Sequence, residues 1–183
     1  MAKFHYKYGG STITRTLNCG AWVNIPVPDI ERTSPDAERG TNLHDMMEDR
    51  LNGETPTPGP SFNEDNQEVL DVATKAVEDF MDNYGLDEYA TETLLTLRDD
   101  IGGSADLLAW NADTVAIIDY KFGYQPVTDR SQFLLYAICG PTTPEWADVF
   151  EDRQVLSVII QPAVSETAQV VEHTPNELRR FHD

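Results

Sequence analysis

Cysteine is scarce in this sequence, and long apolar runs are absent. The 183 residues include two cysteines, Cys19 and Cys139, which lie far apart in the chain. This pattern provides neither a disulfide framework nor the closely spaced pairs of a zinc site. No run of about eighteen apolar residues occurs, so the sequence contains no candidate for a membrane-spanning helix. We therefore expect a protein without a membrane segment and without a cysteine-based metal site.

The chain also begins without the apolar core of a signal peptide, since its first ten residues read MAKFHYKYGG. Hydrophobic residues make up 40% of the sequence, which is enough for one core, and 183 residues is a usual length for one domain. We expect a single domain over residues 1–183, with an N-terminal helical part to residue 60 and a sheet core from residue 61. The expected location is the cytoplasm, which is the host cytoplasm if the protein is viral.

Positive charge is scarce as well. Thirteen lysines and arginines stand against 32 aspartates and glutamates, which gives a net charge of −19. Surfaces that bind nucleic acid are usually basic, because neutralising phosphates contributes much of the affinity. Three explanations for a DNA-binding protein of this charge stay open: metal ions offset the acids locally, the host is adapted to salt, or the acidic surface binds a basic partner protein. Five arginines are candidates to line a DNA path: Arg15, Arg98, Arg130, Arg179 and Arg180.

The segment from Gly102 to Gly123, GGSADLLAWNADTVAIIDYKFG, is the most informative part of the chain. Two apolar stretches flank the turn-type sequence at residues 111–113, which predicts a β-hairpin. The second stretch, TVAIIDY, is short, β-branched and apolar, as in a central buried strand. Because side chains alternate along a strand, Asp119 and Lys121 point to the same side, and Asp106 lies across the strand pair from Asp119.

Two carboxylates and an amine in one place suit the cleavage of phosphodiester bonds. A hard cation such as Mg²⁺ binds carboxylate oxygens together with water and substrate phosphate, and it lowers the pKa of a bound water. Asp106, Asp119 and the backbone carbonyl of Tyr120 are candidate ligands, and Lys121 could hold the attacking water or neutralise charge. The alternative is a solvated Asp-x-Lys pair at a strand end. The position of the pair directly after a buried strand favours the metal site, because burying a charge without a partner is costly.

A second group of polar residues lies on a helix that we expect over residues 35–51. Ser34, followed by a proline and an acid, predicts its start. His44 and Glu48 are four residues apart and share a face, where Gly40 leaves room for another element. His44 is a candidate imidazole ligand for the same metal ion. The alternative is a partly buried histidine bonded to a neighbour.

A third pair follows the hairpin. Thr128 or Asp129 is expected to cap a helix that ends near Gly140. Gln132 and Tyr136 share one face of this otherwise apolar helix and could reach the metal site or a phosphate. The alternative is a half-exposed helix boundary.

In chain order, these motifs are Gly40-x-x-x-His44-x-x-x-Glu48, Gly103-x-x-Asp106, Asp119-x-Lys121 and Gln132-x-x-x-Tyr136. The ordered set resembles the RecB-like branch of the PD-(D/E)xK nuclease superfamily. The segments STITRTLNCGAWVNIP, SPDAERGTNLHDMMEDRL and VLSVIIQPAV resemble a phage-associated family of that branch. The resemblance therefore covers most of residues 11–178. One departure is Arg39, which stands between Glu38 and Gly40 where the family has Glu-Gly.

The resemblance implies a restriction-endonuclease-like fold and a role for each matching residue. His44, Asp106 and Asp119 would bind Mg²⁺ or Mn²⁺ together with the carbonyl of Tyr120. Lys121 would be the catalytic lysine.

Four further residues would support the site or contact DNA: Gln132, Tyr136, Glu48 and Glu92. Several relatives hold an iron–sulfur cluster with four cysteines. Since this chain has two, we expect no such cluster.

The remaining patterns predict an α/β protein with a mixed central sheet flanked by helices. Apolar residues at helical spacing predict a helix over residues 64–84. The other expected elements are a helix at 11–20, a Pro/Gly-rich loop at 53–61, a Pro-rich link at 141–144, a helix start at Thr174-Pro175, and strands at 91–98, 104–110, 114–120, 154–161 and 167–173.

We therefore expect an enzyme: a metal-dependent DNA nuclease, of exonuclease type, in phage or mobile-element recombination or replication. The alternative is an inactive protein on the same fold whose acidic surface mimics DNA or binds a basic partner. The intact set of Asp106, Asp119 and Lys121 favours the enzyme. A metal-dependent phosphatase would need other clusters of acids and histidines, which the sequence lacks.

Overall fold

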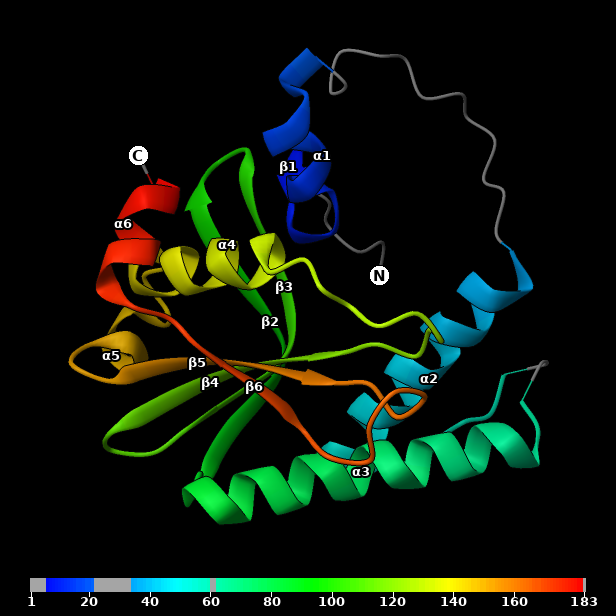
Figure 1. Cartoon of the computed structure of the whole chain (residues 1–183). Helices are drawn as coiled ribbons and strands as arrows, with labels where there is room; N and C mark the ends of the chain where they lie inside the picture. The colour runs from blue at the N-terminus through cyan, green and yellow to red at the C-terminus, as the bar shows by residue number, and fades with distance from the viewer. Residues whose placement is uncertain (1–5, 22–33, 60–61, 183) are drawn as a thin grey trace.

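The computed structural model describes residues 6–21, 34–59 and 62–182, which share one mixed β-sheet covered by helices on both faces (Figure 1). The elements in chain order are β1 (Tyr8–Gly9), η1 (Gly10–Thr12), α1 (Ile13–Asn18), α2 (Pro35–Leu51), α3 (Glu64–Tyr84), β2 (Glu88–Arg98), β3 (Ile101–Trp110), β4 (Thr114–Tyr120), α4 (Ser131–Cys139), η3 (Gly140–Thr142), α5 (Ala147–Phe150), β5 (Gln154–Ile160), β6 (Gln169–Glu172) and α6 (Pro175–His182).

The sheet has six strands in the order β1-β3-β4-β5-β6, and β2 also pairs with β3. The β3–β4 and β2–β3 pairs are antiparallel, whereas β4 and β5 run parallel. A parallel pair needs a crossover, and here the segment containing α4 and α5 provides it. The predicted fold class, a mixed central sheet flanked by helices, is therefore confirmed.

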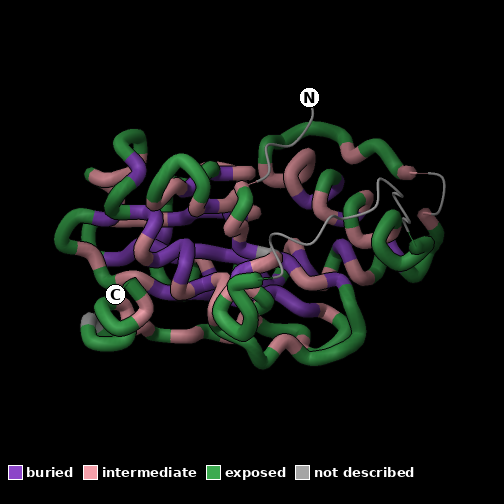
Figure 2. The backbone as a smooth tube through the Cα atoms, turned by 90° about the horizontal axis from the view of Figure 1, so that it is seen from above, coloured by how far each residue is buried: buried purple, intermediate pink, exposed green. Residues whose placement is uncertain are grey.

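Alternation along the strands explains why both faces are covered. Leu107 and Ile118 belong to the core under α2 and α3, whereas their neighbours Leu108 and Ile117 belong to the core under α1 and α4. All seven residues of β4 are buried, as the apolar sequence TVAIIDY predicts for a central strand. Figure 2 shows the buried segments running through the middle of the molecule, with exposed segments around them. None of the described helices is long and apolar enough to cross a membrane.

Several predicted boundaries are confirmed, among them α2 over residues 35–51 and α3 over residues 64–84. The Ser34 side chain caps α2 by accepting a hydrogen bond from the amide of Ala37. At α6, the hydroxyl of Thr174 accepts from the Glu177 amide, which confirms the predicted helix start.

Other boundaries were wrong. β2 begins at residue 88, because residues 88–90 pair with the end of β3. β3 begins at residue 101, because the glycines before Asp106 stay in the ladder with β2. The helix predicted at 11–20 is a 3₁₀ turn followed by the six residues of α1. The link predicted at 141–144 overlaps η3, which begins at residue 140. β6 is shorter than residues 167–173. Residues 22–26 of the N-terminal motif and residues 60–61 of the predicted loop lie outside the described residues.

The environment of His173, just after β6, predicts that the free energy of unfolding depends on pH. Its Nε2 lies 2.6 Å from the hydroxyl of the buried Ser157 on β5. Burial lowers the pKa of His173; the charge of Glu177 opposes this and that of Arg130 adds to it, and the net effect is a lowered pKa. The unfolded chain therefore binds this proton more readily than the native protein, and the free energy of unfolding should fall as the pH drops below about 6.5. Urea unfolding of wild type and His173→Gln at several pH values measures this, and the expected result is a smaller loss at low pH in the variant. An equal loss in both proteins would contradict the assignment.

Candidate active site

A cavity of about 590 Å³ opens where the end of β4 meets α2 and α4. Seven of the predicted site residues line it: His44, Glu92, Asp106, Asp119, Lys121, Gln132 and Tyr136. They come from α2, β2, β3, β4, the residue after β4, and α4. His44 and Tyr136, which are more than ninety positions apart in the sequence, thus share one cavity.

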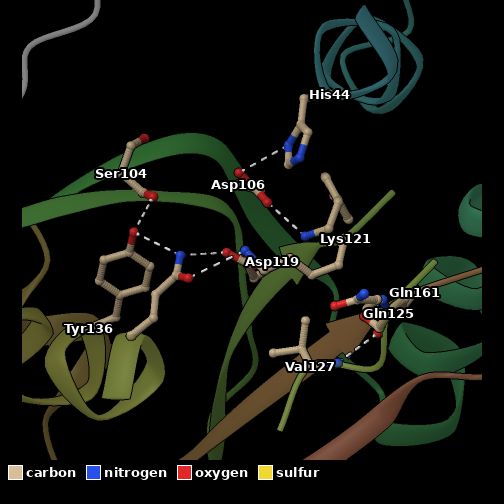
Figure 3. Close-up of polar contacts among 11 residues, drawn as sticks. His44, Ser104, Asp106, Asp119, Lys121, Gln125, Val127, Tyr136 and Gln161 are labelled. Atoms are coloured by element: carbon tan, nitrogen blue, oxygen red, sulfur yellow. Dashed lines mark hydrogen bonds and ion pairs between the residues drawn. The ribbon is translucent and has the colours of Figure 1, made fainter. Parts of the chain in front are cut away.

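Asp106 is fixed by the hairpin. The ladder between β3 and β4 pairs Leu107 with Ile118, so the next residues outward, Asp106 and Asp119, are neighbours across the pair. The Oδ2 of Asp106 accepts a hydrogen bond from the backbone amide of Tyr120 at 2.7 Å. Its Oδ1 lies 3.3 Å from Nδ1 of His44 on α2 (Figure 3). The predicted hairpin and the approach of His44 to its first aspartate are both present.

The Asp106 carboxylate changes the protonation of the histidine. Burial alone lowers the pKa of His44, but the hydrogen bond and negative charge of Asp106 outweigh it and raise this pKa above its ordinary value. The ring of Phe122 packs edge-on against the imidazole, with 5.2 Å between centroids. His44 is therefore held between a carboxylate and an aromatic ring.

Asp119 is the most buried charged group of the cavity, with 2% of its surface exposed. Burial, with the nearby charge of Asp106, raises the pKa of Asp119 to about 6 even though the charge of Lys121 opposes this. Its Oδ2 lies 2.5 Å from the Lys121 ammonium, which is the ion-pair partner of this buried oxygen. The site thus contains a carboxylate oxygen that a cation could bind.

Gln132 and Tyr136 both reach the cavity from α4. Gln132 donates from Nε2 to Asp119 at 2.7 Å and accepts from the ammonium of Lys121 at 3.3 Å, so it contacts both members of the Asp-x-Lys pair. The hydroxyl of Tyr136 donates to the carbonyl of Ser104 at 2.8 Å and lies 3.2 Å from Nε2 of Gln132 (Figure 3). These contacts exclude the simple alternative of a half-exposed helix boundary.

Two glycines make room for the Tyr136 ring. A Cβ added to Gly10 would lie 2.3 Å from the Tyr136 hydroxyl, and one added to Gly103 would lie 2.7 Å from the ring. Such distances are far inside van der Waals contact. The glycine three residues before Asp106 is therefore required by the packing of α4, and η1 forms another wall of the cavity.

The remaining predicted residues, Glu48 and Tyr120, are not among the described residues that line the cavity. Glu92 has a φ of +46°, although the register between β2 and β3 is the same on both sides of it, and its Oε2 accepts from the Ser104 hydroxyl at 3.1 Å. The predicted cap of α4 is displaced, since Asp129 accepts from the Ser131 amide and the N-cap residue is Arg130.

The five arginines that were candidates for a DNA path are likewise not among the described residues lining the cavity, and their contact with DNA stays a prediction.

The donor set suits a divalent cation by its chemistry. One imidazole and two carboxylates, one with a buried oxygen whose partner is the Lys121 ammonium, are ligands that such ions accept. Across residues 6–21, 34–59 and 62–182, however, no three His, Cys, Asp or Glu side chains already stand in the arrangement of a metal cluster. Instead, the protein compensates these charges itself, Asp106 through His44 and Asp119 through Lys121.

Two residues that hold the loop after Lys121 were missed by the sequence reasoning. Gln161, directly after β5 and 1% exposed, donates to the carbonyls of Gly123 and Gln125 and accepts from the amide of Val127 (Figure 3). Arg39 donates to the carbonyl of Phe122 at 3.0 Å. A polar residue directly after a buried strand was the available signal for Gln161, since the same signal marked Asp119.

Replacing Gln161 with leucine should destabilise the protein. The three backbone groups that it pairs with would lose their partners, and each unsatisfied buried group costs about 1–3 kcal/mol, with water recovering part of this in the exposed loop. We expect a decrease in the free energy of unfolding of about 2–3 kcal/mol. Urea denaturation measures it, with Gln125→Leu, an exposed residue of the same loop, as the control. A Gln161→Leu protein as stable as wild type would contradict the described role.

Comparison with known proteins adds little about chemistry. A family model described as "Protein of unknown function (DUF2800)" matches residues 93–183, the part of the chain from within β2 to the C-terminus. No curated protein matches the chain. Among solved structures, the chain is similar to an alkaline exonuclease from Laribacter hongkongensis, with 12% identity, a TM-score of 0.42, and coverage of 95% of this chain and 81% of that one. At these values the likeness carries no argument about activity.

Proposed function

We propose that this protein is a divalent-metal-dependent deoxyribonuclease that hydrolyses phosphodiester bonds in the cavity at the end of β4. The observation that carries the proposal is the convergence of His44, Asp106, Asp119 and Lys121 from three elements and a loop onto one cavity. Isolated Asp-x-Lys sequences are common, whereas this spatial combination is not expected by chance. The resemblance of the motifs to RecB-like nucleases supports an exonuclease acting on phage or mobile-element DNA.

The groups of the proposed site would have three tasks: binding the metal ion, stabilising charge on the phosphate, and holding the other side chains in place. His44, Asp106, Asp119 and the carbonyl of Tyr120 would hold Mg²⁺ or Mn²⁺, which when bound polarises the phosphate and lowers the pKa of a water. Lys121 places a positive charge beside Asp119, where it can stabilise negative charge developing on the phosphate oxygens.

Gln132 holds Asp119 and Lys121 at a fixed separation through one hydrogen bond to each. This fixed geometry means that little reorganisation is needed during the reaction.

The test is incubation of the purified protein with linear DNA and Mg²⁺ or Mn²⁺. We expect DNA to be degraded by wild type, and degradation to be lost in Asp119→Ala and on chelation of the metal. Asp65→Ala, which removes an exposed acid on α3, is the matched control and should retain activity. A wild-type protein that leaves every DNA substrate intact, or an Asp119→Ala protein as active as wild type, would rule the proposal out.

A second candidate is a non-catalytic protein that binds a basic partner through its acidic surface. The observation favouring it is the exposed face of α3 and the residues after it, where nine acids accompany one lysine: Glu64, Asp65, Glu68, Asp71, Glu78, Asp79, Asp82, Asp87 and Glu88, with Lys75. Such a protein needs no metal site. Titration with Mn²⁺ therefore separates the two candidates. The non-catalytic protein should show no Mn²⁺ binding that is lost in Asp106→Ala.

A further inference from the structure

Tyr124 is the most exposed large hydrophobic side chain of the described residues, with 73% of its surface accessible. It lies in the loop between β4 and α4, three residues after Lys121. A single exposed aromatic ring is unremarkable on its own. What distinguishes this ring is the rigidity of the loop that carries it and the cation beside it.

The loop is held on both sides of Tyr124. Gln161 makes three hydrogen bonds to the backbone between Gly123 and Val127. On the N-terminal side, Phe122 is buried against His44, and its carbonyl accepts from Arg39. The loop runs out to α2, where Arg39 and His44 both lie (Figure 1). An exposed aromatic ring on a fixed backbone costs little further ordering when it binds a ligand.

Arg39 supplies the cation. Its guanidinium carbon lies 5.7 Å from the centroid of the Tyr124 ring, within the range of a cation–π contact. Its Nε donates to the buried side chain of Asn66 at 2.5 Å, which fixes the guanidinium in place. A fixed positive charge is notable in a chain with a net charge of −19.

An exposed ring beside a guanidinium is the combination that binds single-stranded nucleic acid, since a base stacks on the ring and the cation attracts the backbone. We propose that Tyr124 and Arg39 form a stacking site for an unpaired base of the strand whose phosphate enters the cavity. This inference rests on the proposed nuclease function. It adds that the DNA is unpaired where it contacts Tyr124, because bases inside a duplex do not present a free face. Single-stranded DNA and a frayed duplex end both meet this condition.

The test is the binding of a fluorescein-labelled thymidine oligonucleotide in Ca²⁺, together with the same oligonucleotide made abasic. Wild type should bind the thymidine strand, and Tyr124→Ala should bind it about 5- to 150-fold more weakly, whereas Tyr124→Phe should stay within about two-fold of wild type. The abasic strand should bind equally to wild type and Tyr124→Ala. Tyr84→Ala, at the exposed end of α3, is the matched control and should not change binding.

Three results would overturn the stacking site. They are no binding of the thymidine strand by wild type, equal binding by Tyr124→Ala, and an equal loss for the abasic strand, which would show a structural role. The two proposals fail separately. Base-dependent binding without cleavage would reject the nuclease and keep the stacking site, whereas cleavage with unchanged binding by Tyr124→Ala would do the reverse.

Discussion

Alanine in place of Lys121 is expected to reduce the rate of DNA hydrolysis by about 10²- to 10⁴-fold, the size of effect seen when one charge-stabilising or proton-transferring group is removed. The ammonium of Lys121 lies in the cavity beside the buried Asp119 carboxylate, where water screens its charge poorly. The loss should appear mainly in kcat, because the lysine would act on charge that develops in the transition state.

Single-turnover cleavage of a labelled DNA end measures this effect without interference from product release. The matched control is Lys75→Ala, which removes an exposed lysine paired with Asp79 on α3 and should leave the rate unchanged. Circular dichroism and the melting temperature establish that the Lys121→Ala protein is folded. If this folded variant cuts DNA at the wild-type rate, Lys121 is not catalytic.

Removal of the Asp106 carboxylate should weaken Mn²⁺ binding by at least about 100-fold, since losing even a group that only supports a ligand costs 10- to 100-fold. Asp106 contacts both His44 and the backbone amide of Tyr120, so its loss also frees the imidazole from its present partner. Isothermal titration of Asp106→Ala with Mn²⁺ measures the change.

Asp113→Ala is the matched control, because this exposed aspartate lies in the turn of the same hairpin. It contributes to the turn through its backbone amide, which donates to the Asn111 side chain and is kept in the variant. It should bind Mn²⁺ as wild type does. Equal Mn²⁺ affinity in Asp106→Ala and wild type would mean that the cation binds elsewhere.

The sequence predicted the hairpin and the central strand well because both follow from local pattern. Residues 111–113 form a turn between two apolar runs, and the alternation of side chains then places Asp106 beside Asp119. His44 was identified through helix spacing and the resemblance, and its contact with Asp106 depends on how α2 packs, which no local pattern encodes.

What the sequence did not predict arises from contacts between distant segments. Gly10 is about 126 positions from Tyr136, yet its missing side chain makes room for that ring. Gln161 makes its three hydrogen bonds to backbone groups, and backbone contacts of this kind do not depend on which residues carry them, so the sequence gives no sign of them. Strand ends were misjudged at Gly102 and Gly103, because glycine usually weakens a strand and here serves close packing instead.

The most direct test of the whole account is a crystal structure of the protein soaked in Mn²⁺, with anomalous diffraction used to locate the ion. The account predicts an anomalous peak between the side chains of His44, Asp106 and Asp119, with the Lys121 ammonium beside it. A peak elsewhere, or an empty cavity at a Mn²⁺ concentration that supports cleavage, would contradict it.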